Sequence, residues 1–279
     1  TTLKAIEKYN VTFIAQLPAM FNLLWRSPYY SKCDLSSLRH AGFGGQAVNS
    51  EFVSKVSAMA PKIFTGFGLT ETSGICSCVS VPLSDSARLV EELGRASSLT
   101  PITVREPMQA NGLAGKELQD GAIGCICLKG PSVFSGYMGM PTETANSLSK
   151  DGYLYTGDMG VFDTRRGLLF TCRSKHIAKP KGYQVYPPEI EDVIIRGLAG
   201  RATNVAILGM PHDIYTDGLV YFIELATGAK LLVEEVYAIA TATLPSYKRP
   251  SYVEIIEPGA MPLNRVAKTD YLVLKKRAE

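Results

Sequence analysis

The sequence lacks the features that mark membrane-spanning or secreted chains. No apolar run approaches the ~18 residues that a membrane-spanning helix needs. The opening Thr1-Thr2-Leu3-Lys4 is not a basic region followed by an apolar one, so no signal peptide is predicted, and the last residues form no peroxisomal Ser-Lys-Leu ending. We therefore expect an intracellular protein, in the cytoplasm.

Cysteine and histidine are also scarce, with six and three residues among 279. Two cysteine pairs are two residues apart, rather than the three of a Cys-x-x-Cys metal or redox site: Cys76/Cys78 and Cys125/Cys127. Residues two apart on a strand share one face, so we interpret these as reduced core thiols. The histidines are scattered, at His40, His176 and His212, and no Cys/His metal cluster is predicted.

Charge of one sign is not concentrated anywhere. The chain holds 29 Lys and Arg against 26 Asp and Glu, a net charge of +3, and both signs are dispersed. A basic surface for nucleic acid is therefore not indicated. Hydrophobic residues make up 46% of the chain, which is enough for one large domain or two smaller ones.

The first part of the chain, about 1–78, has the pattern of a parallel α/β layer. β-rich runs at 11–15, 38–43 and 62–65 alternate with helix-compatible stretches at 19–25 and 51–60. Thr2 and Ser50 are predicted N-caps, and Pro18 stands where a helix can begin. Strand, helix and strand in this order indicate parallel pairing.

From about 79 to 174 the helical period disappears. Short β-rich runs alternate with Gly and Pro at 102–105, 123–129, 133–137 and 168–172, and 163–167 is a predicted hairpin turn. We expect a small distorted antiparallel β-barrel beside the layer. Beyond Lys175 the pattern changes to helices at 189–197 and 231–244 and strands at 204–208, 219–225 and 252–256. The prediction is a large domain, 1–174, and a small α+β domain, 175–279.

Two glycine-rich stretches follow strands of the predicted parallel layer. The first is Gly44-Gly45-Gln46-Ala47, and the second is Gly66-Phe67-Gly68-Leu69-Thr70-Glu71. Ligands of open α/β sheets bind beyond the carboxyl ends of the strands, and glycine lets a flat ring approach the backbone. Phe67 offers a stacking face. The oxygens of Thr70 and Glu71 suit a hard cation such as Mg²⁺ on ATP phosphates.

A second group of polar residues lies on one later segment. It contains Tyr155-Thr156-Gly157-Asp158, Arg173-Ser174-Lys175 and the run from Lys179 to Val185. A carboxylate accepts hydrogen bonds from vicinal hydroxyls, a guanidinium donates to hydroxyl or phosphate oxygens, and lysine supplies mobile positive charge. Together these groups suit a ribose attached to a phosphate.

These motifs resemble those of the adenylate-forming superfamily, which includes acyl- and aryl-CoA synthetases, 4-coumarate:CoA ligase-like enzymes, luciferases and peptide-synthetase adenylation domains. Further matches are Gly124–Pro131 with Gly136-Tyr137, and the loop 262–270 with Lys268. Cys125 stands where the family has Glu, and Ala267 where it has Gly. The resemblance implies the second half of the adenylate-forming fold: α/β layer, β-barrel and small α+β C-terminal domain.

The resemblance also implies roles for individual residues. Lys268, Thr70 and Glu71 would be catalytic, with Glu71 holding Mg²⁺, and Lys175 would be the hinge of the small domain. Nucleotide binding would fall to Gly45, Gln46, Ala47, Gly66, Phe67, Gly68, Leu69, Thr70, Asp158, Arg173 and Lys268. The acyl-adenylate or CoA would meet Lys179, Lys181, Gly182 and Gln184. A cation such as Lys268 offsets the repulsion between an attacking carboxylate and an α-phosphate.

The expected function is therefore that of an acid–thiol ligase, with ATP, Mg²⁺ and CoA. ATP activates a carboxylic acid to an acyl-adenylate, and CoA then takes the acyl group. The acid would lie near Phe13, Gly44, Gly66 and Ile75. Two alternatives stay open: another acceptor, such as a carrier protein or oxygen in a luciferase, and an AMP-binding remnant without turnover. The Ser/Thr/Gly-rich phosphate loop of the family and an initiator Met are absent, so we expect a portion of a longer enzyme, or a truncated gene product, that adenylates poorly or not at all when isolated.

Overall fold

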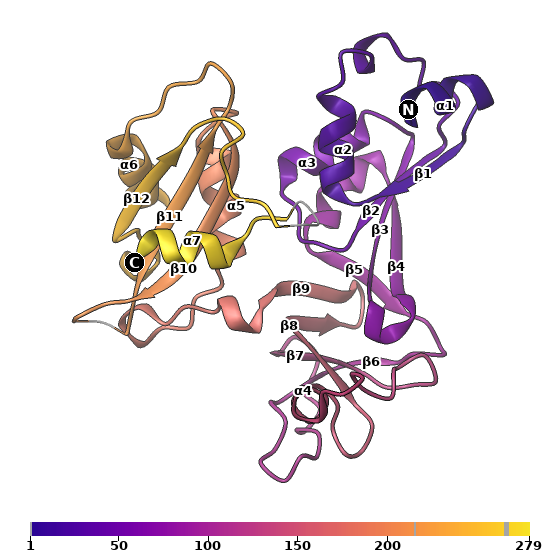
Figure 1. Ribbon diagram of the computed structural model, residues 1–279, viewed down its shortest axis with the longest axis vertical. Helices are drawn as coiled ribbons and strands as arrows, with labels where there is room; N and C mark the ends of the chain where they lie inside the picture. The colour runs from indigo at the N-terminus through magenta and orange to yellow at the C-terminus, as the bar shows by residue number, and fades with distance from the viewer. Residues whose placement is uncertain (1, 215, 265–267) are drawn as a thin grey trace. The chain divides into compact units, whose positions relative to one another are not determined.

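The computed structural model describes residues 2–214, 216–264 and 268–279. The chain divides into two compact units, Thr1–Thr171 and Cys172–Glu279 (Figure 1). Ala267, the predicted departure from the family's glycine, lies outside the described residues.

The first unit begins with the predicted parallel layer. Strands β1 (Phe13–Gln16), β2 (His40–Gly44) and β3 (Lys62–Leu69) pair in parallel, which confirms the predicted strand order. They are connected through helices α2 (Pro18–Trp25) and α3 (Ser50–Ser57), and α1 (Thr2–Tyr9) precedes them. One face of the strands packs with α2 and α3 in an apolar core that includes Ile14, Phe21, Phe43, Val53 and Ile63.

Three local predictions for this layer were wrong by a few residues. Asn49, not Ser50, caps α3, and its Oδ1 accepts the Phe52 N–H at 2.9 Å. Thr2 is the first residue of α1 rather than its cap. β3 runs on to Leu69, so the second glycine stretch begins inside a strand, and the turn starts at Thr70 as the short 3₁₀ helix η2 (Thr70–Thr72).

The antiparallel strands of the first unit continue this same sheet instead of forming a separate barrel. β4 (Gly74–Pro82) pairs with β3 on one side and β5 (Glu92–Ala96) on the other. Then follow β9 (Gly167–Arg173), β8 (Leu154–Asp163), β7 (Ile123–Leu128) and β6 (Ile102–Arg105). The order is β1-β2-β3-β4-β5-β9-β8-β7-β6, with β1 and β6 at the edges, so over the described residues no barrel closes.

Residues 133–137 do not form the predicted strand. They are irregular, with bends at Val133 and Ser135, and Gly130 and Gly136 have positive φ, of +153° and +139°. A Cβ on Gly136 would lie 2.7 Å from Cγ2 of Thr144, which lies in α4 (Pro141–Ser147). By contrast, the predicted hairpin turn between β8 and β9 is confirmed, because Asp163 Oδ1 accepts the N–H groups of Arg165 and Arg166, both at 2.8 Å.

The second unit is the predicted α+β arrangement. β10 (Ala202–Pro211) pairs antiparallel with β11 (Asp217–Leu225), which pairs in parallel with β12 (Tyr252–Ile256). Helices α5 (Pro187–Gly197) and α6 (Val233–Thr243) share one core with this sheet. A separate core joins Phe222 of the sheet to Leu274 of α7 (Tyr271–Ala278), a helix that was not predicted. The sheet is therefore covered on both faces.

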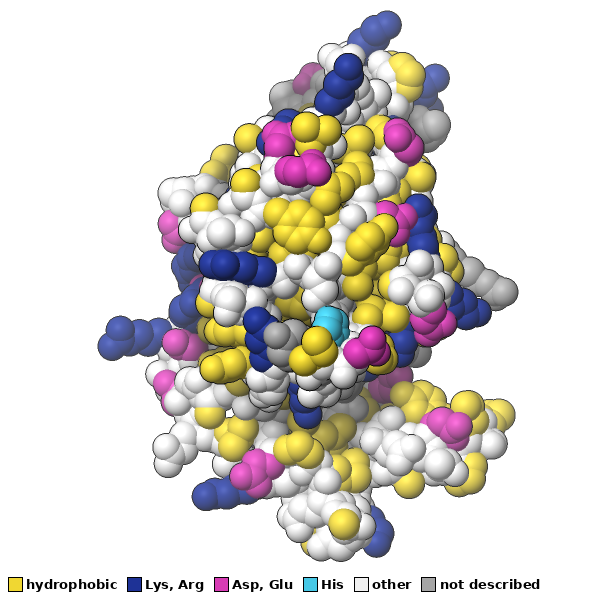
Figure 2. All heavy atoms as spheres, turned by 90° about the vertical axis from the view of Figure 1, so that its left-hand side faces the viewer, with side chains coloured by type: hydrophobic (Ala, Val, Ile, Leu, Met, Phe, Trp, Pro, Cys, Tyr) yellow, Lys and Arg dark blue, Asp and Glu magenta, His cyan; other side chains and the backbone are white. Residues whose placement is uncertain are grey.

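The surface agrees with the balanced charge of the sequence. On the face shown in Figure 2, Lys and Arg side chains alternate with Asp and Glu side chains among hydrophobic ones, without one large patch of a single sign. Over the residues that the structure describes, no helix is both long enough and apolar enough for a membrane span.

Candidate functional site

The loop after β2 and the glycine-rich part of β3 are neighbours. Gly44 pairs with Gly66 in the parallel register, and a Cβ on Gly44 would lie 3.3 Å from the Gly66 carbonyl oxygen. Gly45 follows with φ of +81°, a conformation that favours glycine. Gln46 Oε1 is buried and accepts no hydrogen bond from the described part of the chain. Since buried polar atoms are normally satisfied, this oxygen is an acceptor available to a ligand donor. Ala47 is exposed.

The glycines of β3 are needed because β4 comes close to them. A Cβ on Gly66 would lie 2.7 Å from the Ser77 carbonyl oxygen, and one on Gly68 would lie 2.1 Å from the Gly74 carbonyl oxygen. Between them, the side chain of Phe67 is only 9% exposed and packs in a core with Cys76 and Leu168. This burial favours a packing role for the ring, and its stacking on a nucleotide stays a prediction.

The turn η2 holds Thr70 and Glu71 beyond the end of β3. Its conformation is fixed by Thr72, whose Oγ1 accepts the Leu69 N–H at 3.0 Å and lies 2.9 Å from the Leu69 carbonyl oxygen. Thr70 is exposed, while Glu71 is half-buried and its Oε1 accepts the Tyr137 hydroxyl at 2.7 Å. This hydrogen bond to Glu71 is the main cause that raises the pKa of Tyr137.

Asp158 lies in β8 with only 3% of its surface exposed. Thr156 prepares its position, since the Thr156 hydroxyl donates to the Ile126 carbonyl at 3.0 Å and accepts the Asp158 N–H at 3.1 Å. The Tyr155 hydroxyl is directed elsewhere, donating to the Glu106 carbonyl at 3.1 Å and accepting the Gly115 N–H at 2.8 Å. Successive side chains of a strand point to opposite faces, so Tyr155 lies on the opposite face of β8 from Thr156 and Asp158.

In the second unit, the predicted acyl-adenylate or CoA residues lie on one closed loop. Ala178 and Val185 exchange backbone hydrogen bonds at 3.1 and 2.8 Å, so the residues between them project from a fixed base. Lys181 and Gly182 both have left-handed backbones, with φ of 52° and 81°. Lys179, Lys181, Gly182 and Gln184 are exposed, and Gln184 Nε2 donates to the Tyr186 hydroxyl at 2.8 Å. Arg173 ends β9, and Lys175 lies in the following turn η4 (Ser174–His176).

Lys268 lies on a loop that is tied at both ends. The Asn264 N–H donates to the Lys268 carbonyl at 2.8 Å, and the Lys268 N–H donates to Asn264 Oδ1 at 3.1 Å. The hydroxyl of Thr269 accepts from Asn204 Nδ2 of β10 at 3.2 Å. Glu224 of β11 is buried beneath the preceding turn, and its carboxylate accepts the Gly259 N–H at 2.9 Å and the Met261 N–H at 3.3 Å.

The two units divide the predicted residues between them. Gly45, Gln46, Gly66, Glu71 and Asp158 belong to the first. Arg173, Lys175, Lys268 and the Lys179–Gln184 loop belong to the second. The first unit brings the two glycine stretches side by side, and the convergence of Asp158, Arg173 and Lys268 on one ligand stays a prediction.

Sequence reasoning missed the residues that support this site: Thr72, Tyr137 as a partner of Glu71, Asn264 and Glu224. The repeated hydroxyls of Thr70-Glu71-Thr72 were a local signal for a side-chain cap. Nothing local links Tyr137 to Glu71, because 66 residues separate them.

The oxygen atoms of Thr70 and Glu71 at η2 can bind Mg²⁺ only together with oxygen ligands from a substrate. Among the described residues, no group of three or more His, Cys, Asp or Glu side chains could hold a metal ion. Mg²⁺ is often bound by one or two carboxylates together with substrate phosphates, not by an all-protein cage. Glu71 with the neighbouring Thr70 hydroxyl matches that mode.

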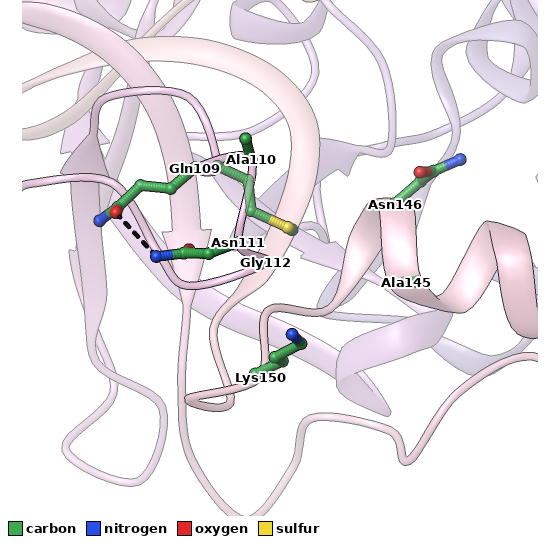
Figure 3. Close-up of a pocket in the computed structure, with 8 residues that line it drawn as sticks. Gln109, Ala110, Asn111, Gly112, Ala145, Asn146 and Lys150 are labelled. Carbon is green, nitrogen blue, oxygen red and sulfur yellow. Dashed lines mark hydrogen bonds between the residues drawn. The ribbon is translucent and has the colours of Figure 1, made fainter.

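A pocket of about 390 Å³ lies elsewhere in the first unit. Figure 3 shows its polar lining, in which Asn111 Nδ2 donates to Gln109 Oε1 at 3.4 Å, with Asn146 and Lys150 across from them. None of the predicted site residues lines it.

Comparison with known proteins gives a consistent relationship. The family model described as "AMP-binding enzyme" matches residues 1–138. The putative acyl–CoA ligase YdaB of Bacillus subtilis is 30% identical over 278 residues, which cover 99% of this chain and 52% of that protein.

Two solved structures extend the relationship to the fold. The amide bond synthetase McbA from Marinactinospora thermotolerans has a TM-score of 0.84 and 26% identity, over 99% of this chain and 54% of that one. ATP-bound MatB from Rhodopseudomonas palustris has a TM-score of 0.82 and 26% identity, over 99% and 52%. The chain spans about half the length of the curated relatives it matches, between 43% and 52%. From these matches and the motifs above, the chain belongs to the adenylate-forming superfamily.

Proposed function

We propose that this chain carries the adenylation and thioester-forming residues of an AMP-forming acyl- or aryl-CoA synthetase. The observation that carries the proposal is the pairing of Gly44, the last residue of β2, with Gly66 inside β3, at the point where the parallel register of these two strands ends. Two adjacent backbones there carry no side chains, and Glu71 lies beyond the end of β3, in η2. A flat ring followed by a phosphate chain fits a surface of that form.

In this proposal, adenine lies against the loop from Gly45 to Ala47. The buried Oε1 of Gln46 is an acceptor for a ring or exocyclic N–H, which would satisfy it. The carboxylate of Asp158 accepts from the ribose hydroxyls, and Arg173 donates to ribose or phosphate oxygens. Glu71 and Thr70 hold Mg²⁺, which when bound neutralises phosphate charge.

The carboxylic acid is proposed to lie on the strand face that carries Phe13. This ring stacks on Phe64 at 5.2 Å and 25°, and Phe64 covers Gly42 so closely that a Cβ there would lie 2.0 Å from its ring. Phe13 and Ile75 remain 56% and 72% exposed, so they offer apolar surface to an acyl or aryl group. Burying such surface stabilises a complex by about 25 cal/mol per Å².

Lys268 is proposed to act at the bond-forming step. The acid's carboxylate oxygen attacks the α-phosphorus, the bond to pyrophosphate breaks, and the ammonium group offsets the negative charge that gathers there. The second unit then turns about Lys175, and the exposed loop of Lys181 and Gly182 meets CoA. The CoA thiolate attacks the acyl carbonyl and AMP leaves. Rotation of one unit about a hinge residue between two chemical steps is a common type of mechanism.

The test is ATP–pyrophosphate exchange with a panel of aliphatic and aromatic carboxylic acids, followed by addition of CoA. We expect exchange with at least one acid, at a low rate because the family's Ser/Thr/Gly-rich phosphate loop is not found in this sequence, and a thioester once CoA is present. Lys268→Ala should lower exchange by about 100- to 1,000-fold, the usual loss for one preorganised group. Lys230→Ala, at an exposed position between β11 and α6, should leave it unchanged. An acyl-adenylate that accumulates with CoA but reacts with a carrier-protein thiol would instead support the alternative acceptor. Nucleotide binding without exchange for any acid would reject adenylation by this chain.

A further inference from the structure

The segment between β7 and α4 folds over η2 and holds Glu71 from two directions. The Tyr137 hydroxyl donates to Glu71 Oε1 at 2.7 Å, and the Phe134 N–H donates to the Glu71 carbonyl at 2.8 Å. The rings of Phe134 and Tyr137 meet edge to face at 4.8 Å, so the two donors support each other. One residue therefore receives both a side-chain and a backbone hydrogen bond from a segment more than 60 residues away.

Tyr137 is itself fixed from behind. Its N–H donates to Thr144 Oγ1 at 2.9 Å, and the Thr144 hydroxyl also lies 2.8 Å from the Met140 carbonyl oxygen at the start of α4. Gly136 is required here, because its φ is +139° and any Cβ would lie 2.7 Å from Thr144. The phenol is thus held by a structured turn and is directed at one carboxylate oxygen.

We propose that Tyr137 is a positioning residue for the divalent cation that Glu71 holds, an inference that rests on the proposed function. The hydroxyl takes Oε1 and fixes the carboxylate plane, so that Oε2 is presented to the cation. Hydrogen bonds from outside the coordination shell orient the ligands of metal sites, and their loss typically costs about 10- to 100-fold in metal affinity. In this role Tyr137 acts through Glu71, the carboxylate that its hydroxyl contacts.

The experiment is a titration of ATP binding, by calorimetry, at a series of MgCl₂ concentrations. Tyr137→Phe keeps the ring and its packing and removes only the hydroxyl. The Mg²⁺ concentration that gives half of the full increase in ATP affinity should be about 10- to 100-fold higher than in the unmodified chain. Saturating Mg²⁺ should restore the ATP affinity. Formation of MgATP in solution is common to all variants and cancels in the comparison.

The chain offers a matched control in the same unit. Tyr29 donates its hydroxyl to Glu7, so Tyr29→Phe removes the same type of hydrogen bond far from η2 along the chain. It should leave the Mg²⁺ titration unchanged. Glu71→Gln should abolish the dependence of ATP affinity on Mg²⁺ altogether. If Tyr137→Phe does not fold, Thr144→Val, which removes the acceptor of the Tyr137 N–H, should give a weaker shift in the same direction.

The outcomes distinguish failure of the positioning role of Tyr137 from failure of the proposed function. A Tyr137→Phe titration that matches the unmodified chain, or a loss of affinity that excess Mg²⁺ does not restore, overturns the positioning role while nucleotide binding stands. ATP binding that does not respond to Mg²⁺ in the unmodified chain also overturns it. A chain that binds no ATP at any Mg²⁺ concentration rejects the proposed function, and the positioning role with it.

Discussion

Removing the fully buried carboxylate of Glu92 should be one of the most destabilising single changes in the first unit. Glu92 Oε2 lies 2.9 Å from Arg88 Nη2, and Oε1 lies 2.6 Å from Arg166 Nε. Arg166 belongs to the turn between β8 and β9, so this ion pair ties β5 to the hairpin that carries Asp158. We expect Glu92→Gln to loosen that connection.

The size of the effect follows from burial and charge. Breaking a buried ion pair by removing one partner costs about 3–5 kcal/mol, because the other charge is left without its partner. The side chains of Arg88 and Arg166 are 44% and 37% exposed, so water can reach both guanidinium groups. Gln also keeps one acceptor oxygen. The expected loss is therefore about 3 kcal/mol, at the lower end of this range.

Unfolding of this unit can be followed without interference from the other. Trp25 is the only tryptophan of the chain and packs against Phe21 and Phe52 in the first unit. Urea unfolding monitored by its fluorescence should give the free-energy difference directly. Glu51→Gln is the matched control, because Glu51 pairs with Lys55 on an exposed helix face, with 37% and 53% exposed side chains. A pair of this type is worth about 0.3–0.5 kcal/mol.

The pH dependence gives a second, independent check. Burial by itself raises the pKa of Glu92, but hydrogen bonds from Arg88 and Arg166 outweigh it and hold the pKa below its ordinary value. The stabilisation is then present above the ordinary glutamate pKa of about 4.3 and is lost as pH falls through the lower folded value. The gap between Glu92→Gln and the unmodified chain should shrink in acid. A gap below about 1 kcal/mol at neutral pH, or one that does not shrink in acid, contradicts the reasoning.

Two further predictions concern other parts of the chain. Burial raises the pKa of Glu191 to about 7, although the Ile207 N–H and Tyr271 hydroxyl hydrogen bonds act against it. The folded second unit should then lose stability as pH rises from about 4.5 through 7, and Glu191→Gln should avoid this loss, which is at most about 3 kcal/mol. Hydrogen exchange of second-unit peptides in urea, at pH 5 and pH 8, compares the stability of Glu191→Gln with that of the unmodified chain. A stability difference between the two proteins that is equal at both pH values would contradict the prediction. Gly68→Ala should cost about 1–3 kcal/mol in the Trp25 assay, because its Cβ would lie 2.1 Å from the Gly74 carbonyl oxygen. Gly44→Ala, with 3.3 Å to its nearest atom, should cost less, and equal costs would refute the steric argument.

The predictable part of the fold was the part specified by local pattern. Alternating strands and helices fixed the parallel layer, and a polar turn with Asp163 and Gly167 fixed the β8–β9 hairpin. The predicted N-cap of α3 was wrong by one residue, because the side chains of both Asn49 and Ser50 are good N-caps. Only the structure shows that Asn49 accepts the Phe52 N–H.

The missed parts depend on contacts between distant residues. A separate barrel was expected because the antiparallel strands are short and Gly-rich. Whether they close on themselves is decided by the pairing of β4 with β3 and of β5 with β9, which no local pattern encodes. Residues 133–137 have β-forming side chains, yet glycines with positive φ bend the segment onto η2. Strand propensity describes a fit to a pleated surface, and it yields where the backbone is bent.

The same misread segment supplies the most specific contact of the candidate site. A strand over 133–137 would have placed successive side chains on opposite faces of the sheet. The bend instead brings Phe134 and Tyr137 together and directs both at Glu71. Local rules therefore fail here where a backbone is held in an uncommon conformation by surrounding contacts, a situation expected at functional sites. The Mg²⁺ titration of Tyr137→Phe decides whether this conformation serves the cation or only the packing of the turn.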